Sequence, residues 1–436
     1  MDGIGAFVRA CAESGEIDLI DLAVVRKDGV LWRATREPYE PDGLRLLFSM
    51  TKSFASLAAG IAVDAGLFGL DDPVAERFAD ALPAAPHPNL FKMRVHHLLT
   101  MTTSIERNTY GELFFEPDWV RAFLAQDFPC VPGTRYLYST HASHMLSALI
   151  RRVAGESLED FLNARLFHPM GIREARWEKS PEGLTAGGMG LSLTVDSLIK
   201  IARLLLNRGI YEGRRLISAE YLACATSARV VKGEGHEGHF AGSGYGYQFH
   251  IMPDGYRMDG AFGQFLLVYP DAGRAVIATS RGTKAEPFLA LVERHLLRAD
   301  GGEEATLPAS VPAAGYDLSG VEGTYILDGN PLGIRRAAFE NGAVAFEYAD
   351  GARDRIGANR GRSRFWKDLQ VWEQRHRAYA RWKPDGTLVL TVFYIETPYV
   401  AEYRFYFFED GLELTFSARP SLVPRDFSVR GTREAH

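Results

Sequence analysis

A stretch poor in large apolar residues divides this 436-residue chain into two parts. Residues 299–315 have the composition of a linker and include Gly301, Gly302, Glu303, Glu304, Pro308 and Pro312. The parts on either side, residues 1–298 and 316–436, are each long enough for a domain of typical size. We therefore expect two domains joined by a linker.

Tight-turn signals dominate residues 316–436. Four dipeptides separate β-rich runs: Asn341-Gly342, Asp350-Gly351, Asp385-Gly386 and Asp410-Gly411. Asn, Asp and Gly tolerate the positive φ that short hairpin turns require. This part is predicted to form an antiparallel β-barrel or sandwich.

Residues 1–298 mix strand and helix patterns. Residues 22–34 resemble a hairpin, and apolar residues recur at helical spacing over residues 49–67. Further helical patterns lie at residues 94–101, 117–126, 140–153, 158–166, 195–207 and 218–226, and strand patterns at 244–251 and 262–280. The expected fold class is α+β, an antiparallel sheet flanked by helices with a mostly helical subdomain.

Composition and charge exclude several classes of protein. Hydrophobic residues make up 46% and charged residues 24%, which is typical of globular proteins. A net charge of −6 gives no general attraction for nucleic acid or acidic membranes. The three cysteines are far apart, and neither an export signal nor a membrane-spanning segment is visible. We expect a cytoplasmic protein whose partner is a small-molecule substrate; the sequence does not indicate an oligomeric state.

Ser49 and Lys52 form a Ser-x-x-Lys motif where an extended segment meets a helix start. Residues three apart share one helical face, so the amine can reach the hydroxyl and act as its base. Ser197 and Lys200 repeat the spacing, but inside an amphipathic helix pattern. Position therefore favours Ser49.

Two further elements could complete an active site. Tyr138 lies in a turn that runs into a helix, where its hydroxyl could pass a proton; a core aromatic is the alternative. Gly260 allows close approach of a strand backbone, so that the N–H of Ala261 could hold an oxyanion; a simple bulge is the alternative.

The order of these elements resembles the serine β-lactamase and penicillin-binding-protein family, nearest its class C-like esterase and peptidase members, over residues 5–298. Supporting stretches include His96-His97-Leu98-Leu99-Thr100, Leu166-Phe167-His168-Pro169-Met170-Gly171 and Gly187-Gly188-Met189-Gly190. The resemblance implies that Ser49 is the acylated nucleophile, Lys52 its base and Tyr138 the proton shuttle. It also implies an oxyanion hole from the N–H groups of Ser49 and Ala261, with no metal or organic cofactor. The implied substrate contacts are Thr140, Met258, Asp259 and Gly260.

The chain departs from the family pattern at two of these contacts. Thr140 stands where the family has the Asn of Tyr-x-Asn, and Met258-Asp259-Gly260 replaces Lys-Thr-Gly or His-x-Gly. The cation that meets a substrate carboxylate is missing, and Arg257 is expected on the opposite face of the strand from Met258. We therefore expect a small ester or amide substrate. Penicillin-binding, β-lactamase or D-amino-acid peptidase activity is the alternative.

Other functions compete with hydrolysis. His141 with His144, and His236 with His239, suggest metal, but their spacings favour ordinary histidines. Residues 353–383 mix cations and aromatics as nucleic-acid binders do, although arginines packed on a β-face explain them more simply; they include Arg360, Arg362, Arg364, Phe365, Trp366, Trp372, Arg375 and Arg377. An idle ligand-binding protein on the same scaffold is the remaining alternative.

Overall fold

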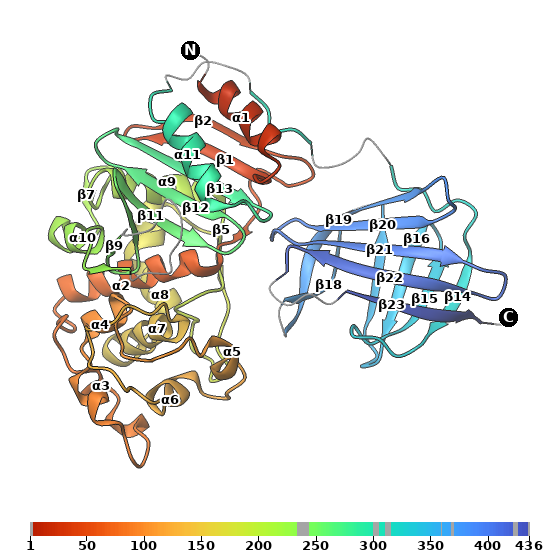
Figure 1. The fold of residues 1–436 in the computed structure, drawn as a ribbon. Helices are drawn as coiled ribbons and strands as arrows, with labels where there is room; N and C mark the ends of the chain where they lie inside the picture. Colours follow the sequence, from red (N-terminus) through yellow and green to blue (C-terminus); the bar gives the residue numbers. More distant parts are fainter. Residues whose placement is uncertain are drawn as a thin grey trace. The chain divides into compact units, whose positions relative to one another are not determined.

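The computed structural model describes residues 3–232, 244–299, 305–309, 315–358, 360–367, 370–421 and 426–434. The chain forms two compact units (Figure 1). The first comprises residues 1–34 and 44–305, and the second comprises residues 35–43 and 306–436. The division after residue 305 falls inside the expected linker, whereas no pattern in the sequence indicated that residues 35–43 would group with the second unit.

An antiparallel sheet forms the centre of the first unit. Its described strands lie in the order β2-β1-β13-β12-β11-β10-β9-β8. Their bounds are β1 Leu19–Arg26, β2 Val30–Thr35, β8 Val230–Val231, β9 Gly244–Tyr245, β10 His250–Met252, β11 Gly255–Gly260, β12 Gln264–Tyr269 and β13 Arg274–Ser280. The expected hairpin is β1 and β2, and the run at residues 262–280 divides into β12 and β13.

Helices cover both faces of this sheet, since its strands alternate side chains between two apolar surfaces. On one face, α1 (Gly3–Ser14) packs on α11 (Ala285–His295), whose Phe288 stacks on Phe265 of β12 at 5.2 Å. On the other face, α9 (Val195–Leu206) contacts β1, β12 and β13. Leu266 of β12 belongs to the core on this second face.

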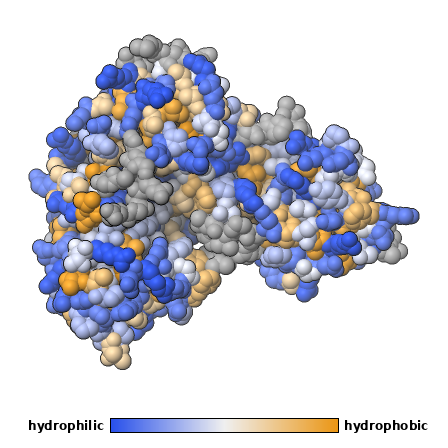
Figure 2. All heavy atoms as spheres, in the orientation of Figure 1, coloured by the Kyte–Doolittle hydropathy of each residue, from blue (hydrophilic) through white to orange (hydrophobic). Residues whose placement is uncertain are grey.

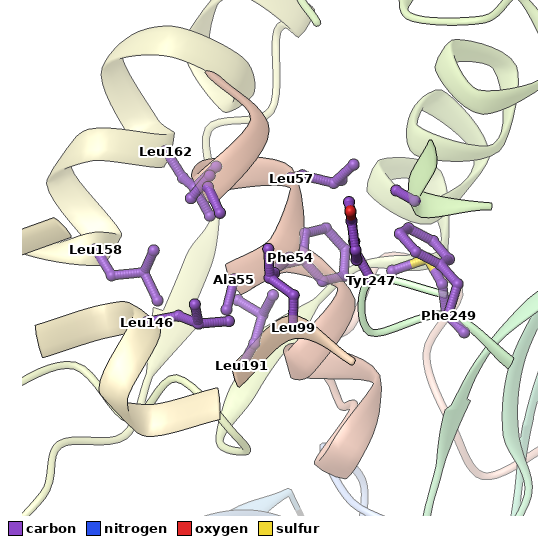
Figure 3. Close-up of a cluster of buried hydrophobic side chains, with 14 of the residues drawn as sticks. Phe54, Ala55, Leu57, Leu99, Leu146, Leu158, Leu162, Leu191, Tyr247 and Phe249 are labelled. Atoms are coloured by element: carbon purple, nitrogen blue, oxygen red, sulfur yellow. The ribbon is translucent and has the colours of Figure 1, made fainter. Parts of the chain in front are cut away.

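The helical subdomain is built around α2 (Thr51–Asp64), which is buried along almost its whole length. Phe54, Ala55 and Leu57 of α2 lie among leucines of neighbouring helices (Figure 3). The other helices are α3 Val74–Arg77, α4 Val95–Leu99, α5 Tyr110–Leu113, α6 Trp119–Leu124, α7 Thr140–Ala154, α8 Leu158–Leu162 and α10 Ala219–Ala225. This arrangement confirms the α+β fold predicted for the first domain.

Short strands connect the subdomain to the main sheet. β3 (Arg45–Leu46) pairs with β5 (Leu191–Leu193), which pairs with β4 (Ala175–Trp177). β6 (Ile210–Tyr211) and β7 (Arg214–Arg215) form a separate hairpin. β3 matters most for function, because it leads directly into the turn that carries Ser49.

The second unit is a nearly closed antiparallel barrel, which decides between the barrel and sandwich alternatives. Its order is β17-β16-β15-β14-β23-β22-β21-β20-β19-β18. The strands are β14 Gly323–Leu327, β15 Ile334–Glu340, β16 Ala343–Tyr348, β17 Arg353–Gly357, β18 Gly361–Lys367, β19 Gln370–Trp382, β20 Leu388–Tyr394, β21 Val400–Phe407, β22 Gly411–Arg419 and β23 Phe427–Arg433. Asn341 and Gly342 both have positive φ and join β15 to β16, as predicted for a tight hairpin.

The face of the molecule shown in Figure 2 is mainly polar. On the face shown in Figure 2, apolar atoms are scattered in patches among hydrophilic ones. No helix among the described residues is long and apolar enough to cross a membrane. Cys11, Cys130 and Cys224 are all free thiols.

Candidate active site

Ser49 lies in a 3₁₀ turn, Phe48–Met50, between β3 and α2. Phe48 adopts φ +50°, a left-handed conformation that a bulky residue keeps only when its surroundings enforce it. Two contacts to β5 fasten the turn: Leu47 N–H donates to the Leu191 carbonyl at 2.8 Å, and Leu191 N–H donates to Thr51 Oγ1 at 3.1 Å. The Ser49 side chain is thereby held half-exposed at the start of the buried helix.

Lys52 follows one helical turn later and points back at Ser49. Its Nζ lies 2.9 Å from Ser49 Oγ and 2.7 Å from the Gly188 carbonyl oxygen. The side chain is 1% exposed, and this burial lowers the pKa of Lys52 from 10.5 to about 7. A large fraction of the amine is therefore neutral at physiological pH and able to accept a proton.

Tyr138 is the third side chain of the group that Ser49 and Lys52 begin. It precedes Ser139, the N-cap of α7, whose Oγ accepts from Ala142 N–H at 3.2 Å. The Tyr138 hydroxyl is hydrogen-bonded to Ser49, and the Lys52 ammonium lies 4.8 Å from the Tyr138 ring centre. Burial raises the pKa of Tyr138 by more than the hydrogen bond with Ser49 lowers it, and the Asp259 carboxylate adds to the rise, so the phenol stays protonated.

The Gly188 carbonyl reaches Lys52 because residues 187 and 188 run unusually close to α7. A Cβ on Gly187 would lie 2.4 Å from the Ser143 carbonyl oxygen, and one on Gly188 would lie 2.5 Å from the Thr140 carbonyl oxygen. Only glycine fits such distances. In the sequence, Gly187 and Gly188 belong to one of the stretches that resemble the family. The structure adds that the Gly188 carbonyl accepts a hydrogen bond from Lys52.

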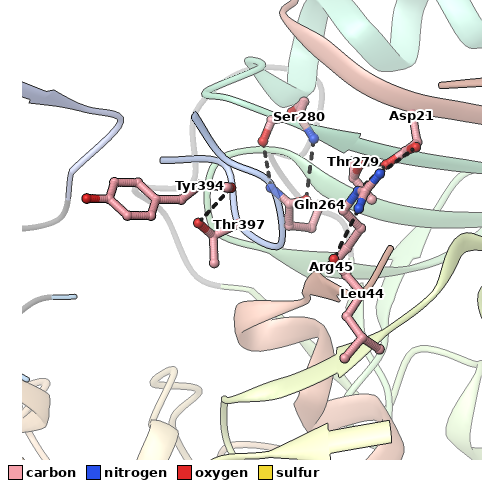
Figure 4. Close-up of polar contacts among 8 residues, drawn as sticks. All are labelled: Asp21, Leu44, Arg45, Gln264, Thr279, Ser280, Tyr394 and Thr397. Carbon is pink, nitrogen blue, oxygen red and sulfur yellow. Dashed lines mark hydrogen bonds and ion pairs between the residues drawn. The ribbon is translucent and has the colours of Figure 1, made fainter. Parts of the chain in front are cut away.

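The end of β11 packs against the nucleophile's turn. A Cβ on Gly260 would lie 2.2 Å from the Leu47 carbonyl oxygen, and the rings of Phe48 and Phe262 meet edge to face at 5.3 Å. Gln264 fixes the following turn by donating to the carbonyls of Ala261, at 3.2 Å, and Ser280, at 2.8 Å (the Ser280 contact is drawn in Figure 4). The backbone of Ala261 is therefore held beside the segment that carries Ser49.

The other three residues expected to contact the substrate are Thr140, Asp259 and Met258, and they differ in exposure and in neighbours. Thr140 is half-buried at the first residue of α7 and packs against Gly188. Asp259 is about one-quarter exposed and pairs with Arg257 at 3.0 Å. Met258 points the other way, because strand residues alternate, and it is fully buried in the helical core. Met258 is thus placed to support the strand rather than to touch a substrate.

The sequence did not single out a second buried lysine near Tyr138. Lys232 is 3% exposed, and its Nζ lies 2.8 Å from His250 Nδ1, whose ring is 6.2 Å from that of Tyr138. Burial and the nearby Arg257 charge together lower the pKa of Lys232 to about 8. No spacing motif links Lys232 to the other residues, so only the folded sheet reveals the cluster.

The second Ser-x-x-Lys motif and the histidine His144 make ordinary structural contacts. Ser197 belongs to the Thr194 cap of α9, and Lys200 pairs with Asp196 at 3.3 Å. His144 Nε2 contacts Glu182 at 3.0 Å. Within the described residues, no cluster of His, Cys, Asp and Glu could hold a metal ion. His236 and His239 lie outside the described residues.

The chain is similar to several known proteins. The family model described as Beta-lactamase matches residues 6–300. Penicillin-binding protein 4 of Amycolatopsis lactamdurans is 26% identical over 72% of this chain and 91% of its own. Esterase EstB of Burkholderia gladioli is 26% identical over 34% of this chain and 42% of its own. The octameric penicillin-binding protein homologue of Pyrococcus abyssi shares the fold over 99% of this chain and 100% of its own, with a TM-score of 0.56 and 18% identity.

The match of the family model to more than half of the chain confirms the resemblance in the sequence. The relatives that the chain matches include penicillin-binding proteins and an esterase. The chain therefore belongs to the beta-lactamase family and is a serine hydrolase of that family's β-lactamase, penicillin-binding-protein and esterase type.

Proposed function

We propose that the protein hydrolyses a small ester or amide through an acyl-enzyme formed on Ser49. The observation that carries this proposal is the position of Ser49 Oγ, which lies 2.9 Å from Lys52 Nζ and is also bonded to the Tyr138 hydroxyl. A nucleophile needs a base within hydrogen-bond distance, and a lysine serves as one only when its pKa is brought close to the working pH. Lys52 meets both requirements.

In the first half of the proposed reaction, Ser49 Oγ attacks the acyl carbon while its proton moves to neutral Lys52. The carbonyl oxygen gains negative charge and accepts hydrogen bonds from the N–H groups of Ser49 and Ala261. Lys52 then returns the proton to the leaving group through the Tyr138 hydroxyl, the bond to the leaving group breaks, and an ester of Ser49 remains. Tyr138 suits this relay because it stays protonated.

In the second half, water attacks the Ser49 ester. The same amine accepts a proton from the water and returns one to Ser49 Oγ, which releases the carboxylic acid product. Each residue ends in its starting protonation state, so the cycle needs no external acid or base.

An uncharged substrate fits the surroundings of Tyr138. Arg257 and Lys232 are almost fully buried and are bonded to Asp259 and His250. The Arg257 charge is therefore paired within the protein, and burial together with the Arg257 charge lowers the pKa of Lys232 to about 8. The name of esterase EstB supports an ester. The similarity to penicillin-binding protein 4, over 91% of that protein, favours penicillin binding as the second candidate.

Hydrolysis of p-nitrophenyl acetate and butyrate, compared with hydrolysis of nitrocefin, tests the proposal. The wild type should release p-nitrophenol, the Ser49→Ala variant should lose this activity, and the Ser197→Ala variant should keep it nearly unchanged. Activity that depends on Ser197 instead would overturn the assignment. A stable penicillin adduct on the wild type with slow ester turnover would select the second candidate.

A further inference from the structure

Gln248 is a buried polar residue in the turn between β9 and β10. It is 2% exposed, and its backbone adopts φ +64°, a conformation that residues other than glycine seldom take. Tyr247 and Phe249, on either side of it, pack in the hydrophobic core with Phe54 and Leu99 (Figure 3). A buried amide is stable only when its polar atoms are hydrogen-bonded, so the partners of Gln248 show what it holds together.

Three helices supply these partners. Ser53 of α2 donates from Oγ to the Gln248 carbonyl at 2.6 Å. Ser143 of α7 donates from Oγ to Gln248 Oε1 at 2.7 Å. At the end of α4, the Leu99 carbonyl accepts from Gln248 N–H at 3.1 Å, and Gln248 Nε2 donates to the carbonyls of Leu98 and Leu99, both at 2.9 Å. Gln248 therefore joins α2, α4 and α7 at one point.

Two of these links lie next to the proposed catalytic residues. Ser53 directly follows Lys52, whose Nζ lies 2.9 Å from Ser49 Oγ. Ser143 lies in the first turn of α7, which begins two residues after Tyr138. Gln248 thus connects the helix that carries the base to the helix that follows the proton relay.

The link to α4 reaches Tyr138 from another direction. Two residues after Leu99, Met101 adopts φ +60°. Its carbonyl accepts from Leu137 N–H at 2.9 Å, and Ser139 N–H donates to its Sδ at 3.3 Å. The residues before and after Tyr138 are therefore both bonded to Met101, which keeps its strained conformation only while its neighbours constrain it.

We infer that Gln248 is a positioning residue, which fixes the distance between the Tyr138 hydroxyl and the pair formed by Ser49 and Lys52. The inference rests on the proposed function, because it takes Tyr138 as the proton relay. A relay works only at hydrogen-bond distance, so a small shift of α7 against α2 is enough to slow it. Loss of the Gln248 amide should therefore slow protonation of the leaving group more than attack by Ser49.

The test compares kcat/KM for two esters with the same acyl group, phenyl butyrate and p-nitrophenyl butyrate. Phenolate is the stronger base and needs a proton to leave, whereas p-nitrophenolate departs without one. In Gln248→Met, which fills similar space without the amide hydrogen bonds, kcat/KM should fall about tenfold or more for phenyl butyrate and about two- to threefold for p-nitrophenyl butyrate. A loss of folded protein would lower both values by the same factor.

Tyr138→Phe provides the reference for a lost relay. It should show the same selective loss on phenyl butyrate, and adding Gln248→Met to it should cost little more, because the two changes disable one step.

The matched control is Tyr221→Phe. The Tyr221 hydroxyl donates to the Ser56 carbonyl of α2 at 2.9 Å and lies 3.0 Å from Ser56 Oγ, so this variant also removes a buried hydrogen bond of α2. Tyr221 belongs to α10, which carries none of the proposed catalytic residues. Tyr221→Phe should melt at a lower temperature but keep the wild-type ratio of the two kcat/KM values.

Equal losses on both esters in folded Gln248→Met, or wild-type values on both, would overturn the inference. If that variant does not fold, Ser143→Ala removes only the link to α7 and should show a smaller loss that is again selective for phenyl butyrate; an unchanged ratio there would overturn the inference equally. A wild type that hydrolyses neither ester would refute the proposed function instead.

Discussion

Burial of Lys52 should make the stability of the catalytic unit depend on pH in a calculable way. Its pKa falls from 10.5 to about 7, so at pH 9 the unfolded state binds a proton that the folded state does not. At about 1.4 kcal/mol for each pKa unit, burial of this side chain costs about 4 kcal/mol at pH 7 and about 2 kcal/mol at pH 9. The penalty is complete below pH 7 and disappears as the pH rises towards 10.5.

The Lys52→Met variant removes this titration while filling similar volume. It also leaves the Gly188 carbonyl without the Lys52 hydrogen bond, a cost that does not change with pH. The free energy of unfolding of the wild type minus that of the variant should therefore rise by about 2 kcal/mol between pH 7 and pH 9. Other titrating groups contribute equally to both proteins and cancel.

Urea-dependent hydrogen exchange of α7 peptides measures this difference, because α7 packs on α2 and reports on the catalytic unit alone. Lys52→Met should also be inactive at both pH values. A difference in unfolding free energy that stays constant between pH 7 and pH 9 would refute the lowered pKa, and with it the argument that Lys52 is a neutral base.

Three further predictions concern the site directly. The wild-type rate of Ser49 acylation should rise with pH through an apparent pKa near 7, because Lys52 must be neutral; a flat profile from pH 5 to 9 would contradict this. Tyr138→Phe should keep the wild-type melting temperature within a few degrees but lower kcat for ester hydrolysis by about 100-fold or more, since the proton relay is lost. Gly188→Ala should fold poorly and be inactive because its Cβ would lie 2.5 Å from the Thr140 carbonyl oxygen, whereas Gly111→Ala, with no atom within 4 Å, should melt like the wild type.

The parts of the fold that depend on local signals were predictable from the sequence. The Asn341-Gly342 turn needs only two residues that tolerate positive φ, and the helix after Ser49 needs only its own apolar spacing. The burial of Met258 could have been anticipated from strand alternation, because Met258 pairs with Leu266, which faces the same core.

Features that depend on contacts between distant segments were not predictable in this way. The Gly188 carbonyl reaches Lys52 only after α2 and α7 have packed, and Lys232 approaches His250 only across neighbouring strands. Residues 35–43 carry the loop signals Pro38, Pro41 and Gly43, but nothing local indicated that Glu40 would pair with arginines more than 300 positions later. Such partners are fixed by the tertiary fold rather than by sequence spacing.

Intact-mass analysis after reaction with a fluorophosphonate tests the central claim most directly. The wild type should gain the mass of one phosphonyl group, peptide mapping should place it on Ser49, and the Ser49→Ala variant should gain none. An adduct of equal yield on Ser49→Ala, or no adduct on folded wild-type protein, would contradict the assignment of Ser49 as an activated nucleophile.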